Sequence, residues 1–199
     1  MLGALLACDP EIGEGSQDLF QILSSMDIED MAEQWPYLSS EEAAPLLQEL
    51  QRGAAQDAHE LAREYRKLFV GPTVLAAPPY GSVYTDRDMV VFGKSTLDLR
   101  TWLRRVGIGV NDLDGAPEDH IATMLSLLGW MLQVKPQLVN DYLKDHLLTW
   151  APHYLEELEE AAEDEDSTFY RSLAQLTRDT LLAMQADQAI EVVLPRFYR

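Results

Sequence analysis

The sequence contains very little cysteine: Cys8 is the only one among 199 residues. A single cysteine excludes an intrachain disulfide and a metal cluster held by cysteine ligands. Disulfides are typical of oxidising compartments, so a chain without one fits a reducing compartment. We therefore expect the protein to be cytoplasmic.

Basic residues are also scarce. The chain has 15 Lys and Arg against 34 Asp and Glu, which gives a formal net charge of −19 at pH 7, and no basic residue precedes Arg52. A field of this sign repels nucleic-acid phosphates and anionic membranes, so we expect neither as a partner, whereas a cationic partner is attracted. The densest acidic run, residues 156–166, is typical of a solvated helix end, and the alternative is that it steers a basic peptide.

Long hydrophobic runs are missing. The longest, residues 121–134, has 14 residues, whereas a helix that spans a bilayer needs about 20. Residues 1–10 include a short apolar run with no basic residue ahead of it, which does not resemble a secretory signal. The sequence therefore predicts no integral membrane segment, a short helix near residue 2 and a buried core helix over residues 121–134.

Strand signals are nearly absent. No two segments form a convincing hairpin pattern, and the only strand-like run is residues 90–92. Elsewhere apolar residues recur at the spacing of amphipathic helices. We expect an all-α fold in which residues 1–199 form a single helical domain of about eight to nine helices. The predicted helices cover residues 2–8, 17–23, 41–52, 57–69, 95–106, 117–134, 136–148, 150–162 and 167–184, and an apolar tail at 190–198 packs back as an extended strip.

Three local patterns indicate where helices begin. Ser39 and Glu42 have the spacing of a capping box, and Ser95 with Asp98 resembles one. Pro117 is well placed as a first helical residue, because two acidic residues follow it and complement the positive end of the helix.

One segment, residues 70–94, has no helical periodicity. It combines three prolines and three glycines with aromatic side chains such as Tyr80 and Tyr84. Long loops inside compact domains are usually functional or disordered, and the apolar content argues against disorder. We expect one long irregular loop that contributes to a functional surface.

Catalytic and cofactor motifs are lacking as well. Residues 93–96 resemble the end of a phosphate-binding loop, but the position five residues before Gly93 is Asp88 instead of glycine, and its carboxylate repels phosphate. The four histidines lack paired metal-ligand spacing, and no nucleophile motif is present. We therefore expect no enzyme activity, no cofactor and no metal, and a nucleotide hydrolase is the least favoured function.

Asp119 and His120 leave two interpretations open. Adjacent helical residues do not face one another, so the pair is not a catalytic dyad. In the first interpretation Asp119 complements the helix dipole and His120 makes a hydrogen bond within the core. In the second, both border a pocket where Asp119 meets a cationic group and His120 is a polar contact.

Five blocks resemble one family, in order along the chain. They are residues 65–72 (YRKLFVGP), 77–86 (APPYGSVYTD), 92–97 (FGKSTL), 117–120 (PEDH) and 146–150 (HLLTW). The blocks resemble the redox-enzyme maturation chaperones of the DmsD/TorD type, most closely the DmsD branch, the chaperones of dimethyl sulfoxide reductase. The resemblance implies an all-helical, cytoplasmic protein without catalytic activity. Such a protein binds the twin-arginine signal peptide, or leader, of a molybdenum-cofactor oxidoreductase and delays export until the cofactor is loaded.

The resemblance also implies a leader-binding surface. A leader has a basic head and an apolar segment, which need carboxylates and an aromatic groove respectively. We expect the loop to bring Tyr80 and Tyr84 towards Leu68 and Phe69, with a polar end beside them. The implied residues are Tyr65, Leu68, Phe69, Pro79, Tyr80, Ser82, Tyr84, Asp119 and His120.

The partners follow from the same resemblance. They are the leader and catalytic subunit of a molybdenum-containing reductase similar to dimethyl sulfoxide reductase, and components of the Tat translocase. An alternative client is a nitrate-reductase-like subunit whose assembly does not depend on the leader.

Overall fold

The computed structural model describes residues 1–13, 15–71, 74–109 and 117–199. Every regular element in these ranges is a helix, which confirms the predicted all-α class. Eleven α-helices lie in the described residues, more than the sequence pattern predicts, because several are too short to show periodicity. The elements are α1 Leu2–Ala7, α2 Ser16–Ser24, α3 Ile28–Glu33, α4 Ser40–Ala54, α5 Ala58–Tyr65, the π turn η1 Arg66–Val70, α6 Gly81–Thr85, α7 Lys94–Arg105, α8 Ile121–Val134, the 3-10 turn η2 Pro136–Leu138, α9 Val139–Tyr142, the π turn η3 Leu143–Leu147, α10 Ala151–Asp164 and α11 Thr168–Asp187.

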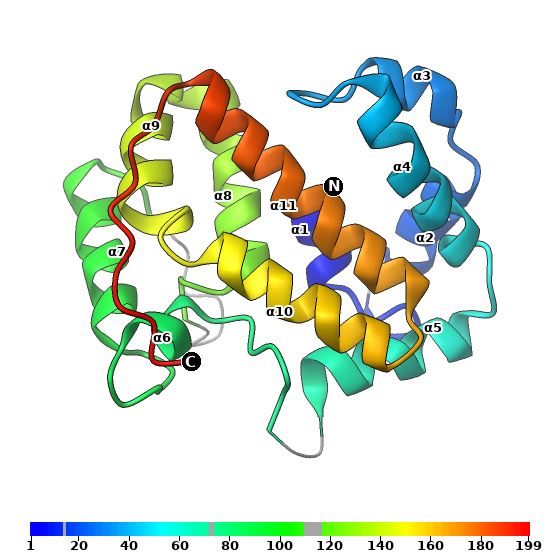
Figure 1. The fold of residues 1–199 in the computed structure, drawn as a ribbon, viewed down its shortest axis with the longest axis horizontal. Coiled ribbons are helices and arrows are strands. Elements are labelled where there is room, and N and C mark those ends of the chain that lie inside the picture. Colours follow the sequence, from blue (N-terminus) through cyan, green and yellow to red (C-terminus); the bar gives the residue numbers. More distant parts are fainter. Residues whose placement is uncertain (14, 72–73, 110–116) are drawn as a thin grey trace.

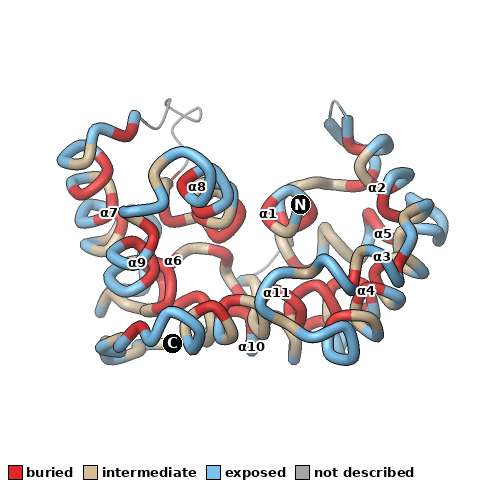
Figure 2. Tube along the Cα trace, turned by 90° about the horizontal axis from the view of Figure 1, so that it is seen from above, coloured by how far each residue is buried: buried red, intermediate tan, exposed pale blue. Residues whose placement is uncertain are grey.

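Helices α10 and α11 form an antiparallel pair at the centre of the arrangement. They run diagonally across Figure 1, with α2 to α5 on one side and α6 to α9 on the other. Helix α11 packs against α4 and α1, and α1 packs against α8, so the two sides are joined through the middle. Figure 2 shows from above that the buried segments face this centre.

The turn between α10 and α11 shows how local sequence fixes this pair. The Ser167 hydroxyl caps α11 by accepting a hydrogen bond from the Tyr170 backbone N–H at 3.4 Å, and it donates to Glu64 of α5 at 2.6 Å. Leu158 and Leu173, one on each helix, are both fully buried. Burial of such a side chain contributes about 1.5–3 kcal/mol, so the packed faces stabilise the pair more than the cap does.

Of the three predicted helix starts, the structure confirms one. The capping box of α4 is confirmed, because Ser39 Oγ accepts from Glu42 N and Glu42 Oε2 accepts from Ser39 N. The box at Ser95 is wrong: α7 begins at Lys94 without a side-chain cap of its own, and the carboxylate of Asp86 accepts from Ser95 N at 3.4 Å instead.

The third predicted start, at Pro117, is also wrong. Helix α8 begins at Ile121, and His120 is its N-cap, with its Nδ1 accepting a hydrogen bond from Ala122 N at 3.2 Å. Residues 117–119 precede the helix as a turn. Their backbone is engaged by the loop instead of continuing the helix, as described below.

Residues 81–85, inside the segment predicted to be a loop, form the short helix α6. Three of its residues, Gly81, Ser82 and Tyr84, are fully or almost fully buried. Trp150 lies directly against the backbone of Gly81, so close that a Cβ at this position would lie 2.8 Å from the indole ring. Tertiary contact therefore stabilises a helical turn that local periodicity does not predict.

The segment 136–148, predicted as one helix, is divided into η2, α9 and η3. π turns are rare and are frequently found at functional sites. In this chain η1 includes Leu68 and Phe69, and η3 includes Asp145 and His146.

The apolar tail after α11 packs back along the molecule as an extended segment, as predicted. Tyr198 N donates to Tyr84 O at 3.0 Å, and the ring of Phe197 stacks on His153 at 4.5 Å. The guanidinium of Arg199 donates to Leu75 O at 3.0 Å. The tail thus joins α6 and the preceding loop to α10 (Figure 1).

Among the helices of the described ranges, none has both the length and the apolar character that crossing a membrane requires.

Candidate functional site

The loop and the start of α8 lie side by side. They form an antiparallel bridge in which Gly81 N donates to Asp119 O at 3.1 Å and Ile121 N donates to Pro79 O at 2.9 Å. The ring of Tyr80 meets the imidazole of His120 edge to face, with 5.1 Å between centroids. Two sequence blocks that are 40 positions apart therefore lie side by side, as a common groove requires.

Asp119 is the buried acid of this surface. Its exposed fraction is 2%. Its Oδ2 accepts from Ser82 N at 2.7 Å, whereas its Oδ1 has no hydrogen-bond partner among the described residues. The hydroxyls of Ser82 and Thr96 lie beside the carboxylate and favour its charged form.

Burial raises the pKa of Asp119, and the backbone hydrogen bond from Ser82 opposes that rise. A buried acceptor is stabilised by a donor, which the Ser82 or Thr96 hydroxyl or a ligand can supply to this carboxylate.

His120 is held neutral. Burial lowers its pKa to about 4. Because Nδ1 accepts from Ala122 N, the proton of the neutral ring is on Nε2. His120 therefore caps α8 and offers one N–H donor. Both sequence interpretations are met in part, since His120 makes a local hydrogen bond and Asp119 lines a pocket.

An aromatic cluster forms the apolar end. Tyr65 and Phe69 stack with 4.9 Å between centroids, and Phe69 meets Tyr170 of α11 edge to face at 5.4 Å. Burial raises the pKa of Tyr65 to about 12, with smaller contributions from Asp9, Cys8 and the phenol of Tyr80. Tyr65, Phe69 and Tyr170 therefore form one aromatic cluster.

Besides Asp119, four of the predicted site residues are buried. Leu68 is 5% exposed, Ser82 and Tyr84 are fully buried, and Pro79 is buried as well. Their physical role here is to support the surface from below. Tyr65, Phe69, Tyr80 and His120 are only partly buried.

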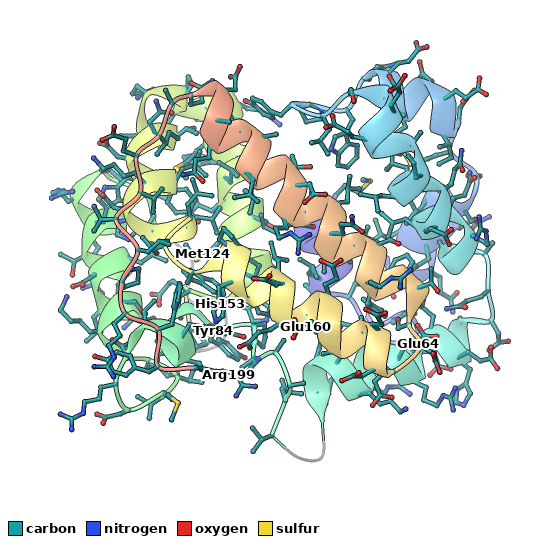
Figure 3. The ribbon with its side chains drawn as sticks, viewed as in Figure 1. Glu64, Tyr84, Met124, His153, Glu160 and Arg199 are labelled. Carbon is teal, nitrogen blue, oxygen red and sulfur yellow. The ribbon has the colours of Figure 1, made fainter. Side chains whose placement is uncertain are left out.

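Tyr84 also points in a different direction from the one predicted. It stacks on Trp150 at 5.9 Å and meets Tyr154 and His153 edge to face, instead of approaching Leu68 and Phe69. The reason is the helical turn of α6, which directs this ring towards α10; Figure 3 shows Tyr84 beside His153.

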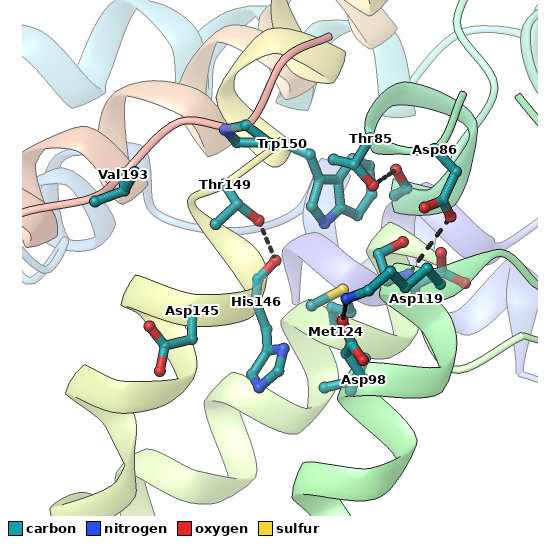
Figure 4. Close-up of a pocket in the computed structure, with 15 residues that line it drawn as sticks. Thr85, Asp86, Asp98, Asp119, Met124, Asp145, His146, Thr149, Trp150 and Val193 are labelled. Carbon is teal, nitrogen blue, oxygen red and sulfur yellow. Dashed lines mark hydrogen bonds and ion pairs between the residues drawn. The ribbon is translucent and has the colours of Figure 1, made fainter. Parts of the chain in front are cut away.

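A pocket adjoins the polar end, with a volume of about 230 Å³. Its wall is formed by α6, α7, the start of α8, η3 and the tail (Figure 4). Asp119 lines it together with the more exposed carboxylates of Asp86, Asp98 and Asp145. No sequence pattern indicates the last three. The block 146–150 belongs to the resemblance, but nothing in its pattern indicates that η3 lies opposite α7.

The arrangement does not resemble a metal centre. Among the described residues no three His, Cys, Asp or Glu side chains converge closely enough to hold a metal ion. The surface combines aromatic rings, a buried carboxylate and a neutral histidine, which suits binding of a cationic, partly apolar segment.

The matching family model defines the class of protein. It is the nitrate reductase delta subunit family, matched over residues 32–170. The chain belongs to this family.

Several proteins of similar sequence are named as chaperones. The chain is 34% identical to the Tat proofreading chaperone DmsD of Salmonella typhi over 200 aligned positions, which cover all of this chain and 93% of the relative. It is 42% identical to the probable Tat proofreading chaperone DmsD of Haemophilus influenzae over 75% of this chain and 71% of the relative. A chaperone protein TorD of Vibrio vulnificus is 31% identical over 61% of each chain.

A solved structure supports the fold alone. A redox enzyme maturation protein from Archaeoglobus fulgidus superposes with a TM-score of 0.50 at 24% identity, covering 86% of this chain and 96% of that one.

Proposed function

We propose that this protein is a cytoplasmic chaperone that binds the twin-arginine leader of a molybdenum-cofactor oxidoreductase and delays export of the catalytic subunit until its cofactor is loaded. The proposal includes no catalytic activity and no cofactor of its own. The observation that carries it is the pairing of Tyr80 with His120, which brings an aromatic surface and a buried carboxylate together. Relatives named Tat proofreading chaperones support the same function.

The chemistry of the surface fits a leader in two parts. Tyr65, Phe69 and Tyr80 supply flat apolar area with little side-chain entropy to lose. Asp119 supplies an acceptor for an arginine, and the net charge of −19 draws a cationic segment towards the protein. The buried residues Leu68, Pro79, Ser82 and Tyr84 hold this surface in place.

We propose that the client is a reductase similar to dimethyl sulfoxide reductase, and that Tat translocase components are further partners. The names of the DmsD relatives support the chaperone role, and the name of the matching family favours a nitrate-reductase-like client as the second candidate. Co-purification separates the two: recovery of a catalytic subunit that lacks its leader favours the second. A nucleotide hydrolase is disfavoured further, because the ammonium of Lys94 pairs with Asp98 and the Asp86 carboxylate lies against Gly93.

The test is calorimetric titration of a synthetic twin-arginine leader against the wild type and two tyrosine variants. Tyr80→Ala should weaken binding about tenfold or more, because an aromatic anchor at a protein interface is typically worth over 1 kcal/mol. Tyr37→Ala is the matched control, since Tyr37 is 40% exposed and lies outside this surface. Equal affinity for a leader with both arginines replaced by glutamine would refute twin-arginine recognition. Equal affinities of the two tyrosine variants would refute the assigned surface.

A further inference from the structure

Four consecutive apolar residues are exposed in the turn that joins α6 to α7. These residues, 89–92 (MVVF), which we call the apolar turn, are between 41% and 50% exposed, and Leu97 near the start of α7 is 51% exposed. None of them lines the pocket beside Asp119. Single exposed apolar side chains are ordinary, but a contiguous apolar patch on a protein surface typically marks an interaction site.

The backbone of the apolar turn is strained. Met89 has a φ of 47° and Phe92 has a φ of 66°, which lie in the left-handed region that residues with a Cβ rarely adopt. Burial does not explain this conformation, because both side chains are about half exposed. Strained backbone persists only where the surrounding structure imposes it, and it is concentrated at functional sites.

Asp86 holds the apolar turn in this conformation. Its backbone carbonyl accepts a hydrogen bond from Met89 N at 3.0 Å, and its carboxylate accepts one from Ser95 N at 3.4 Å, so it is bonded to both sides of the turn. The carboxylate also lies against the backbone of Gly93, where a Cβ would collide with it. The turn is therefore a fixed part of the surface, and Phe92 is carried by a backbone held in one place.

The apolar turn continues into an exposed face of α7. Leu97, Thr101 and Arg105 follow one another at intervals of four residues and are all exposed, so they share one side of the helix. Figure 1 and Figure 2 both show α7 at the outer edge of the molecule, away from α2 to α5. The turn and this face thus form one surface, which is apolar where α7 begins and cationic where it ends.

The charge of this surface is opposite to that of the whole protein. Residues 87–105 contain five Lys and Arg and two Asp, whereas the chain has a net charge of −19. Arg104 and Arg105 are exposed in the last turn of α7, and neither forms an ion pair with another described residue. Their charge can therefore act on a partner.

This charge decides which part of the client fits the surface. A leader has a basic head, which a cationic surface repels, so the leader is not its occupant. An acidic protein surface with an apolar hollow is complementary to it. The mature part of the catalytic subunit follows the leader in the same chain, and the apolar turn follows α6, whose first residue, Gly81, donates to Asp119 O. The mature part of the client therefore comes close to this surface when the leader is bound.

We infer that the apolar turn and the exposed face of α7 form a docking surface for the mature part of the catalytic subunit, at an acidic patch with an apolar hollow that receives Phe92. The inference rests on the proposed function for the identity of the client. It assigns the client a second contact, separate from the surface that binds the leader.

The first test measures binding of the proposed catalytic subunit, produced without its leader, by biolayer interferometry. Phe92→Gly removes the ring and also relieves the strain, because glycine adopts a positive φ freely. It should weaken binding about fivefold or more, as expected for an aromatic anchor, and should not lower the midpoint of urea unfolding. Tyr37→Gly is the matched control, since Tyr37 has a φ of 68° and is 40% exposed outside this surface. Equal binding by the two variants, or a lower urea midpoint for Phe92→Gly than for the wild type, would overturn the inference.

The second test reverses one charge on each side of the molecule. Arg105→Glu should slow association of the leaderless subunit about threefold and make the rate less dependent on salt, because a charge at the rim of an interface steers the encounter. Arg63→Glu makes the same change at an exposed position of α5, on the other side of the molecule, and should leave the rate unchanged. Equal association rates for the two variants would contradict docking at α7.

The outcomes separate this inference from the proposed function. If the wild type binds the isolated leader but not the leaderless subunit, the docking surface fails and the proposed function stands. If the wild type binds the leaderless subunit through Phe92 but does not bind the leader, leader recognition fails and the docking surface stands. Sedimentation with vesicles of phosphatidylglycerol tests a membrane as the occupant. Binding to these vesicles that depends on Phe92, with unchanged binding of Phe92→Gly to the subunit, would assign the surface to a membrane and overturn the inference.

Discussion

Gly81→Ala tests whether α6 is held in place by Trp150. The added Cβ would lie 2.8 Å from both Cε2 and Nε1 of the indole, although real Cβ atoms essentially never approach closer than 3.0 Å. The indole has no room to retreat, because Trp150 is 2% exposed and packs against Tyr84 and Tyr154. Overpacking of this kind costs about 1–3 kcal/mol. In a chain of this size each kcal/mol lowers Tm by about 2–4 °C.

The assay is urea unfolding followed by circular dichroism, with Gly129→Ala as the matched control. Nothing lies within 4 Å of a Cβ added at Gly129, which is inside α8. This control should raise the free energy of unfolding by about 0.5–1 kcal/mol, because alanine favours the helix. Gly81→Ala should lower it and should also weaken leader binding, because Gly81 and Ser82 are the donors to Asp119. A Gly81→Ala protein as stable as the wild type would refute the close packing of α6 on Trp150.

Two further predictions concern the histidine cap and the tail. Burial lowers the pKa of His120 from 6.5 to about 4, so the unfolded chain binds this proton first as pH falls and the folded state loses stability between these values. His120→Asn keeps an N-cap but removes the titration of the histidine. When the pH is lowered from about 7 to about 4.5, the free energy of unfolding of this variant should therefore fall by about 1–2 kcal/mol less than that of the wild type. Equal losses in urea unfolding would contradict the buried neutral histidine. Arg199→Ala removes the donors to Leu75 O and Ala76 O and the ion pair with Glu157, so amide hydrogen exchange should become faster at residues 75–77 and in α6 but not in α4. Unchanged exchange in α6 would show that the tail does not hold it.

Much of the fold follows from local sequence. The long helices α4, α8, α10 and α11 carry strong apolar patterns, and the Ser39 cap depends only on residues within one turn. Local sequence does not predict the start of α7, because the acceptor for Ser95 N comes from Asp86, eight positions before the first residue of the helix, across a loop. It does not predict α6 either, because a buried tryptophan from a distant segment stabilises this helix.

The candidate site, too, follows from the sequence only in part. The resemblance identified Tyr80, Asp119 and His120, and the structure places these residues together. The burial of Tyr84 could not be predicted, because it depends on how a short helical turn packs against α10. The sequence pattern does not predict that Asp145 lines the pocket, because its place depends on a π turn and on the position of η3 opposite α7, and neither has a periodic signal.

The most direct test of the central claim is to map where a twin-arginine leader contacts the protein. Backbone amide signals of 15N-labelled protein are followed while the synthetic leader is added. We predict the largest shifts at Tyr80 to Ser82 and at Asp119 and His120, where the loop pairs with the start of α8. Shifts confined instead to the separate apolar groove between α1, α3, α8 and α11, lined by residues such as Met31 and Met184, would contradict the account.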